Sequence, residues 1–440
     1  MAVNIELLYN CCLLVLPNVP LSLKSNYSEL QLFIDEALNR SDKREVLKEE
    51  LTDCYYINQD RPFDLPWWQK FFWSLVYAVI LLVATGGNII VIWIVLAHRR
   101  MRTVTNCFLV NLSVADLMMS LLNCAFNFIF LLNSNWPFGV VYCTINNFVA
   151  HVTVASSVFT LVVISCDRYM AIMYPLQHRN SRKKTVITLI LIWSFSSALA
   201  IPCLLYSTTT SRRYRGSTRT SCYLSWPDGG YLNSRTEYCY NILFLLLTYL
   251  IPMTVMIVCY SCMGRKLWGS QSIGEQTHNQ KESINSKRKV VKMFIIVVII
   301  FAVCWMPYQG FFIFVYHHRS FVEKSYVQHV YLSFYWLAMS NSMVNPIIYY
   351  WMNNRFRVYF ELIICKCYCV MGRTNVRRGE MQELATLQRS GLAVCNSGRC
   401  KSTSLRWRPS VAESQIQTFK MNTVRTMCEK LQSKEDVVII

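Results

Sequence analysis

Charge is scarce in this sequence of 440 residues. Only 16% of the residues are Asp, Glu, Lys or Arg, whereas 53% are hydrophobic. A soluble domain of this size needs more charge on its surface, so the composition favours a membrane protein. Catalytic motifs are lacking too: the sequence has no phosphate-binding glycine loop, no His-Glu-x-x-His pair and no nucleophile motif beside a base. We therefore predict that the protein is not an enzyme.

Long stretches without any charged residue indicate membrane spans. Five such stretches reach 26 residues or more, at 71–97, 185–211, 238–264, 293–318 and 325–354. About 20 apolar residues suffice to cross a bilayer as a helix. A sixth stretch, 103–166, has Asp116 as its only charge and is long enough for two spans, which turn-forming residues at 135–139 divide. The sequence therefore predicts an all-α fold, a bundle of seven transmembrane helices over residues 67–352.

The loops predicted to face the cytoplasm are rich in Lys and Arg. This bias places the N-terminus outside the cell and the protein in the plasma membrane. Residues 1–66 then form an extracellular tail with glycosylation sequons at Asn26 and Asn39. A net charge of +19 would also suit nucleic acid, but the basic residues lie between membrane spans, where they favour anionic lipid. The second outer loop opposes the bias and offers a basic patch for ligand contact: Arg212, Arg213, Arg215, Arg219 and Arg235.

Two cysteines are predicted to lie on the oxidising side of the membrane close to the bundle. Cys143 begins the third span and Cys222 lies in the second outer loop, so we expect a disulfide between them. Three further extracellular cysteines, Cys11, Cys12 and Cys54, have no evident partner in the sequence. Residues 7–21 are apolar but lack a basic leader, which leaves a cleaved signal peptide open.

The residues after the bundle predict a membrane-bound segment and a polar tail. Within residues 353–370, the amphipathic pattern of 353–364 favours a short helix on the inner leaflet. Cys365, Cys367 and Cys369 follow directly and are placed for palmitoylation, with unmodified cytoplasmic thiols as the alternative. Residues 371–440 are rich in Ser, Thr and Arg, and we predict that this cytoplasmic tail is disordered.

Polar residues within the predicted spans are candidates for function, because burying them in hydrocarbon is costly. Asp116 is the only carboxylate among them, and Ser157, Asn341 and Asn345 are predicted in neighbouring spans. Such oxygens can hold a sodium ion, or the carboxyl can take a proton; a purely structural hydrogen-bond network is the alternative. No other metal or cofactor is expected. A transporter would show inverted repeats or several intramembrane charges, which disfavours that class.

Motifs in every span resemble those of the rhodopsin-like G-protein-coupled receptors. The third span ends on Asp167-Arg168-Tyr169, 25 residues after Cys143. The resemblance covers residues 67–370 and includes these further positions: Gly87-Asn88, Trp193, Pro252 with Tyr260, Cys304-Trp305-Met306-Pro307 and Asn345-Pro346-Ile347-Ile348-Tyr349.

The resemblance to this receptor family implies how the predicted switch residues work. Arg168 would bind a heterotrimeric G protein once the sixth helix swings outward, with Tyr260 and Tyr349 turning inward to support it. Trp305 would lie beneath the ligand, and Asp116 with its three predicted partners would line a sodium site. A phosphorylated C-terminal tail would engage arrestin.

The ligand class follows from a closer resemblance. Receptors for amines carry an aspartate where Ala150 stands, and opsins need a lysine within 325–354, where the sequence has none. Segments 98–106, 167–172, 222–227, 287–293 and 353–357 are similar to tachykinin receptors. That similarity implies a Gq-coupled receptor for an amidated neuropeptide, with another amidated neuropeptide as the alternative ligand. The implied peptide contacts, for which ordinary interhelical hydrogen bonds are the alternative, are Asn123, Asn127, Asn147, Gln309 and Tyr331.

Three residues near the implied ligand site depart from the vertebrate pattern. Asp116 and Gln309 stand where vertebrate tachykinin receptors usually carry glutamate and histidine, and Asn146 stands where they carry histidine. These differences suggest an invertebrate relative. An Arg-amide peptide such as an insect tachykinin or natalisin is then as plausible a ligand as a Met-amide peptide.

Overall fold

The computed structural model describes residues 4–16, 19–40, 43–62, 64–175, 182–229, 234–269, 278–318, 321–322, 324 and 326–364. Residues 1–348 form one compact unit, and a second unit begins at Tyr349. The predicted palmitoylation sites Cys365, Cys367 and Cys369 and the predicted disordered tail 371–440 lie outside the described residues.

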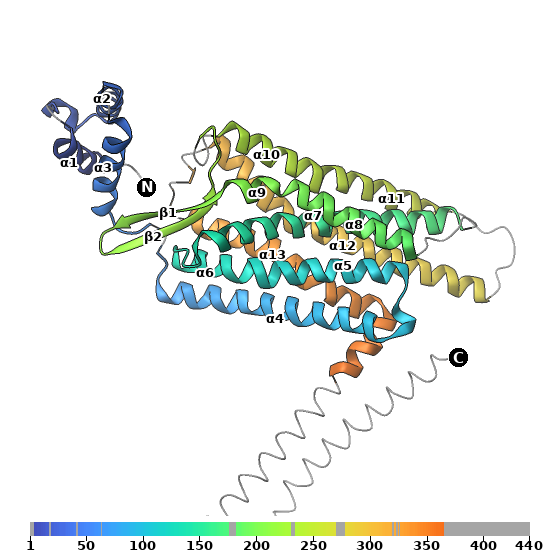
Figure 1. Cartoon of the computed structure of the whole chain (residues 1–440). Coiled ribbons are helices and arrows are strands. Elements are labelled where there is room, and N and C mark those ends of the chain that lie inside the picture. The colour runs from blue at the N-terminus through green and yellow to red at the C-terminus, as the bar shows by residue number, and fades with distance from the viewer. Residues whose placement is uncertain are drawn as a thin grey trace, which may run out of the picture. The chain divides into compact units, whose positions relative to one another are not determined.

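In the part of the chain that the structure describes, seven helical segments form a bundle, as the charge-free stretches predicted (Figure 1). The first three are α4 (Trp67–Ala97), then α5 (Val104–Met118) continuing through the π-helical turn η3 (Met119–Cys124) into α6 (Ala125–Asn133), and α7 (Gly139–Met173). The other four are α8 (Arg182–Leu199) with α9 (Ile201–Tyr206), α10 (Arg235–Leu245) continuing through η4 (Leu246–Leu250) into α11 (Ile251–Gly269), α12 (His278–His317) and α13 (Val327–Met352).

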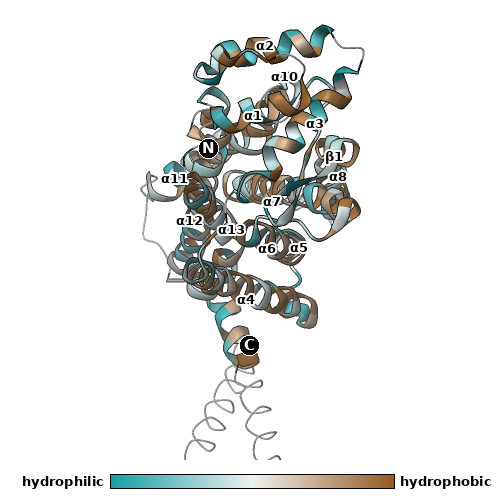
Figure 2. Cartoon of the chain, turned by 90° about the vertical axis from the view of Figure 1, so that its left-hand side faces the viewer, coloured by the Kyte–Doolittle hydropathy of each residue, from teal (hydrophilic) through white to brown (hydrophobic). Residues whose placement is uncertain are grey.

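Within the described residues, five of these segments are long and apolar enough to cross a membrane by length and composition alone. The fourth and seventh segments are more polar. Helix α8 begins with three consecutive basic residues, 182–184, and α13 carries polar side chains such as Ser340, Asn341 and Asn345. Figure 2 shows the hydrophobic character of the bundle helices, in line with a protein that spans a membrane several times.

The central helix is α7, which contacts α5, α8, α9 and α11. Polar side chains hold these helices together from inside. Asn111 in α5 donates from Nδ2 to Thr160 Oγ1 in α7 at 2.8 Å, and Trp193 in α8 donates from Nε1 to Asn111 Oδ1 at 2.7 Å. Interhelical hydrogen bonds of this kind take the place of the hydrophobic effect, which cannot drive helices together within lipid.

The charge-free stretch 185–211 covers more than the fourth helix. The helical backbone ends at Tyr206, and strand β1 (Ser207–Tyr214) follows at once. It pairs antiparallel with β2 (Ser217–Leu224) to form a hairpin, whose turn has Gly216 in the left-handed region at φ +72°. An absence of charge cannot distinguish a strand from a helix, so the all-α prediction holds for the bundle and misses the hairpin.

Residues 4–57, which we call the N-terminal module, are folded. They comprise α1 (Ile5–Val15), the short η1 (Leu21–Lys24), α2 (Tyr27–Arg40) and α3 (Arg44–Ile57). Leu30, Ile34 and Leu38 recur along one face of α2 and are buried in a common core with α1 and α3. A disulfide joins Cys11 to Cys54. No partner for these two cysteines is evident from the sequence, and the structure supplies this correction. Cys12 is buried and not disulfide-bonded.

In the second unit, residues 354–364 are helical. The Phe356 ring packs on Tyr349 with ring centroids 5.8 Å apart, and Arg357 pairs with Glu361 at 3.0 Å one turn further on. This ion pair raises the pKa of Arg357. Phe356, Phe360 and Leu362 are buried, whereas Arg355 and Arg357 are exposed, so the segment is amphipathic.

The first and seventh segments approach each other closely at Gly87. A Cβ atom built at Gly87 would lie 2.8 Å from Pro346 Cβ and 2.9 Å from Pro346 Cγ, closer than real contacts permit. The proline ring is rigid and cannot move aside as a flexible side chain would. Only glycine therefore fits at this position.

We predict that Gly87→Ala destabilises the helix bundle by about 1–3 kcal/mol, the usual cost of overpacking a filled core. Thermal unfolding of the detergent-solubilised protein would measure the loss. Gly86→Ala is the matched control, because a Cβ there would meet nothing within 4 Å. That neighbour should be neutral or more stable, since alanine favours a helix over glycine by about 0.5–1 kcal/mol. Equal Tm values for the two variants would contradict the packing argument.

Candidate functional site

Asp116 of α5 is the centre of a buried polar network. Its side chain is 2% exposed. Two residues of α13 bind it: Ser342 Oγ donates to Oδ1 at 3.1 Å, and Asn345 Nδ2 donates to Oδ2 at 2.8 Å. Asn88 of α4 joins the network by donating from Nδ2 to the Ser342 carbonyl oxygen at 2.9 Å. The network thus connects the first, second and seventh segments and satisfies a carboxyl group that would be costly to bury alone.

A cavity of about 10 Å³ lies beside Asp116, close to the smallest space that holds one water molecule. Ser157 and Asn341 contribute to its polar lining, and Trp305 closes its apolar side. Of the three predicted partners of the carboxyl group, two therefore border this cavity, and the third, Asn345, is bonded to the carboxyl itself. Ser342, which donates to the carboxyl group, was not predicted.

An aromatic chain extends from the cavity toward the hairpin end of the bundle. Trp305 contacts Phe301 on one side and Tyr308 on the other, with ring centroids 6.2 and 5.9 Å apart. Tyr308 in turn contacts Tyr331 of α13 at 6.1 Å. Pro307 lies within α12 next to Trp305. Because proline lacks a backbone donor and permits a kink, this part of α12 is suited to bending.

At the other end of α7, Arg168 and Asp167 form an ion pair with Arg168 Nη2 3.4 Å from Asp167 Oδ2. Thr105 of α5 donates from Oγ1 to the same Asp167 oxygen at 3.2 Å. One turn before, Ser165 donates from Oγ to the Tyr260 hydroxyl of α11 at 2.9 Å. The arginine is thus held by its neighbour Asp167, and the serine three residues before it binds a buried tyrosine of the fifth segment.

Two other predicted switch residues have different surroundings. Tyr169 lies beside Tyr174 with ring centroids 6.4 Å apart. Tyr349 belongs to the second unit, where its ring contacts Phe356, so its predicted support of Arg168 stays a prediction. Pro346 lies inside α13 opposite Gly87.

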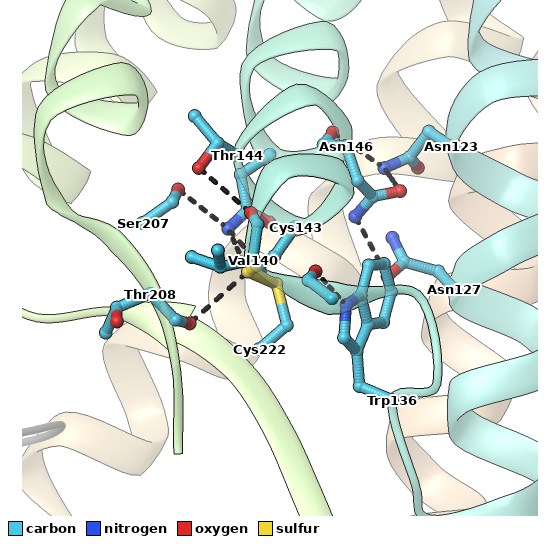
Figure 3. The surroundings of a disulfide bond; sticks show 12 residues. Asn123, Asn127, Trp136, Val140, Cys143, Thr144, Asn146, Ser207, Thr208 and Cys222 are labelled. Atoms are coloured by element: carbon cyan, nitrogen blue, oxygen red, sulfur yellow. Dashed lines mark hydrogen bonds between the residues drawn. A yellow bond between two sulfur atoms is a disulfide. The ribbon is translucent and has the colours of Figure 1, made fainter.

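Three of the five predicted ligand contacts are asparagines near the hairpin end, and Asn146 of α7 connects two of them (Figure 3). Asn123 donates from Nδ2 to Asn146 Oδ1 at 3.2 Å, and Asn146 donates from Nδ2 to Asn127 Oδ1 at 3.2 Å. Tyr335 of α13 extends the row by donating to Asn123 Oδ1 at 3.1 Å. Asn146 was noted only as a departure from the vertebrate pattern, yet it is 1% exposed and central to this row.

Asn147 points to a different partner, the hairpin. It donates from Nδ2 to Ser207 Oγ at 3.0 Å and lies 3.6 Å from Cys222 Sγ. The predicted disulfide between Cys143 and Cys222 is present, and it ties β2 to the start of α7 (Figure 3). The hairpin is therefore bound covalently to the central helix of the bundle.

The remaining two predicted contacts come from α12 and α13. Tyr331 belongs to an aromatic cluster with Tyr308, Phe311 and Tyr335, with ring centroids 5.5 to 6.2 Å apart. Gln309 is half-buried directly after Tyr308. Among the described residues, no hydrogen bond joins Gln309 to the other four predicted contacts.

Sequence reasoning missed a further buried group in the same half of the bundle. His151 Nδ1 lies 2.8 Å from the Asn147 carbonyl oxygen and 3.2 Å from Cys203 Sγ of α9. Its ring meets Phe244 of α10 edge-on at 4.9 Å. A single histidine in a long charge-free stretch was the only available signal.

A buried carboxyl between the second and seventh segments, an Asp-Arg-Tyr latch at the end of the third and a proline beside a tryptophan in the sixth together define a seven-helix membrane receptor. Residues 87–349 match the 7 transmembrane receptor (rhodopsin family). The chain belongs to this family. Membership in a receptor family also confirms that it is not an enzyme.

Among its relatives, the chain is 52% identical to the tachykinin-like peptides receptor 86C of Drosophila melanogaster over 427 residues, 94% of this chain and 84% of that receptor. It is 49% identical to the tachykinin-like peptides receptor 99D of the same fly over 69% of this chain and 59% of that receptor. The human neuromedin-K receptor is 43% identical over 70% of this chain and 64% of its own. The predicted resemblance to tachykinin receptors is confirmed.

Proposed function

We propose that this protein is a plasma-membrane receptor for a tachykinin-like amidated neuropeptide, with its N-terminus outside the cell. Agonist binding would activate a heterotrimeric G protein, Gq, and release calcium. The observation that carries the proposal is the 52% identity, over 94% of the chain, to a receptor named for tachykinin-like peptides. A receptor for another amidated neuropeptide is the alternative.

The side chains at the hairpin end suit an amidated peptide. A terminal carboxamide offers both donors and an acceptor, and so do the amides of Asn123, Asn127 and Asn147. The aromatic cluster around Tyr331 offers an apolar surface for an aromatic side chain of the peptide. Half-buried Gln309 would contribute a further amide. We propose that the peptide exchanges hydrogen bonds with this row and packs on the cluster.

The aromatic chain supports a route from ligand to G protein. A peptide that packs on Tyr331 would bias Tyr308 and Trp305, next to Pro307 in α12. An agonist shifts the receptor toward its active state only if it binds that state better. Movement of α12 at its cytoplasmic end would then expose Arg168 to the G protein.

A calcium assay in transfected cells tests the proposal, with Arg-amide and Met-amide tachykinin-like peptides in parallel. We expect at least one amidated peptide to act, and its free-acid form to be weaker by about 10-fold or more, because the buried amides would lose a partner. A response confined to unrelated amidated peptides would support the alternative. No response to any amidated peptide at normal surface expression would contradict both.

Further modifications and partners belong to the same proposal. Asn26 is half-buried directly before α2, and Asn39 is exposed near the end of that helix. We propose that both sequons carry glycans. We propose palmitoylation of Cys365, Cys367 or Cys369, which would hold the amphipathic segment 354–364 to the inner leaflet and its lipids. Phosphorylation of the Ser- and Thr-rich tail would recruit arrestin.

We also propose that Asp116, Ser157, Asn341 and Asn345 hold a sodium ion in the receptor's inactive state. The residues fit the ion, since carboxylate, hydroxyl and amide oxygens are the ligands that hard cations prefer. The cavity beside Asp116 is small and lined by several of them. The bound ion would neutralise the carboxylate, and the alternative is a purely structural hydrogen-bond network.

Raising sodium at constant ionic strength should therefore weaken agonist affinity by about 5-fold or more, the lower range of allosteric coupling. Asp116→Asn should remove this dependence, because an amide cannot neutralise the ion. Choline as the replacement cation keeps general screening constant, so that attraction of the peptide to the outer surface does not change. Equal sodium sensitivity in variant and wild type would leave Asp116 a structural residue.

A further inference from the structure

The hairpin is fixed at one end by the bundle. Besides the Cys143–Cys222 disulfide, Thr220 donates from its backbone nitrogen to Asn135 Oδ1 at 2.8 Å and accepts from the Trp136 backbone nitrogen at 2.9 Å. The opposite end, residues 212–219, forms the hairpin tip. Arg212 and Arg219 lie directly opposite each other at this tip. Like charges in a cross-strand pair destabilise a hairpin. Arg219 donates from Nε to the Ser134 carbonyl oxygen of the bundle at 3.0 Å, so Arg212 is the member of the pair that needs a contact from outside the hairpin.

The N-terminal module supplies that support. Arg212 lies over the Tyr56 ring, with its guanidinium carbon 4.7 Å from the ring centroid. The same Tyr56 ring meets Tyr214 edge-on at 5.4 Å, and Tyr214 is buried. Just beyond α3, the Gln59 carbonyl oxygen accepts from the Arg215 backbone nitrogen at 2.9 Å. The Tyr56 ring thus contacts both the positive charge of Arg212 and the ring of Tyr214, two residues further along β1.

The module is rigid enough to act as a support. The Cys11–Cys54 disulfide joins α1 to α3, and the Asn4 backbone nitrogen donates to the Tyr55 hydroxyl at 3.2 Å. Burial raises the pKa of the adjacent Cys12 thiol to about 11. Since only a thiolate attacks a disulfide, this raised pKa makes Cys12 less reactive toward the bond next to it.

The linker between the module and the first transmembrane helix is also held. Asp64 accepts from Lys70 Nζ of α4 and from Arg61 Nη2, both at 2.9 Å. These partners, Lys70 foremost, lower the pKa of Asp64, so the carboxylate stays charged at neutral pH. The module is therefore anchored at two places, the hairpin tip through Tyr56 and Gln59 and the helix α4 through Asp64.

We propose that the N-terminal module is a disulfide-stapled clamp that holds the hairpin tip in place for peptide binding, with Tyr56 as its positioning residue. The inference rests on the proposed function. A hairpin already held in its bound position costs the peptide less ordering on binding, which raises affinity without any added contact. The clamp therefore acts on peptide binding from outside the predicted ligand contacts.

The test measures binding and dissociation of a labelled Arg-amide tachykinin-like peptide, and of a Met-amide one, on intact cells at matched surface expression. Tyr56→Ala should lower affinity about 10-fold, mainly through faster dissociation. Tyr56→Phe keeps the ring and should restore the wild-type rate. Replacing both Cys11 and Cys54 with serine should act like Tyr56→Ala. Tyr27→Ala is the matched control, because it removes an exposed tyrosine of the same module and leaves the Asn26 sequon intact.

Unchanged dissociation from the Tyr56→Ala and double-serine variants would overturn the clamp, and so would a Tyr56→Phe variant that behaves like alanine. A mature receptor whose N-terminus lies beyond Cys11, as removal of 7–21 with a signal peptide would produce, would overturn it as well; mass spectrometry of the purified protein decides this. Failure of the wild type to bind either peptide would instead count against the proposed function.

Discussion

Arg168→Ala should bind peptide with near wild-type affinity and lose calcium signalling by about 30-fold or more. The arginine lies at the end of α7 opposite the hairpin, far along the chain from every predicted ligand contact. Its ion pair with Asp167 is only partly exposed, at 24% and 16% of the two side chains. In the proposed active state Arg168 contacts the G protein instead, and losing one charged contact at an interface costs about 2 kcal/mol or more, which corresponds to this loss of signalling.

Two further variants sharpen the test. Arg168→Lys keeps the charge but loses the planar fork of donors, so we expect intermediate signalling. Arg182→Ala removes an exposed positive charge at the same end of the bundle and should signal nearly as well as the wild type. Peptide binding and calcium release must be compared at equal surface expression. Normal calcium release from Arg168→Ala would remove this residue from the mechanism.

Cys143→Ala and Cys222→Ala should each abolish surface expression or lower peptide affinity by about 100-fold or more. The bond closes a loop with a sequence separation of 79 residues. Removing a native disulfide typically costs about 2–5 kcal/mol. Its loss would also release the hairpin from Asn147, a predicted peptide contact that bonds to Ser207. Radioligand binding on intact cells, normalised to receptor number, measures the effect.

In each single variant the remaining cysteine keeps a free thiol, which could itself lower binding by forming a wrong disulfide. The double variant Cys143→Ala with Cys222→Ala removes both thiols and so excludes this cause. We expect it to bind as poorly as the single variants. Cys239→Ala is the control, since this cysteine of α10 is exposed and not disulfide-bonded. Unchanged affinity in the double variant under oxidising conditions would make the bond dispensable.

The sequence predicted the bundle because membrane spans are recorded directly in runs without charge. A run without charge does not distinguish a helix from a strand. The run at 185–211 therefore continues from the fourth helix into β1 at Ser207 without a change in composition. The predicted polar residues of the network were found because hydrocarbon makes any polar group conspicuous. Ser342 escaped, since a serine among several in one helix does not reveal which way it faces.

The N-terminal module was missed for a different reason. Three cysteines allow several pairings, and only the fold selects Cys11 with Cys54. The spacing of Leu30, Ile34 and Leu38 indicates an amphipathic helix. A polar extracellular segment ahead of seven spans is nevertheless typical of a simple tail, and this spacing alone does not predict that the helix packs against two others.

The contact between Gly87 and Pro346 also constrains the order in which this lineage can change. A methyl group at position 87 has no room while the proline ring stands 2.8 Å away. Substitution at 346 by a smaller residue must therefore come first, and the reverse order passes through an unstable intermediate. Substitutions at the two sites therefore depend on each other although 259 positions separate them. A reconstructed ancestor with alanine at 87 should lack proline at 346.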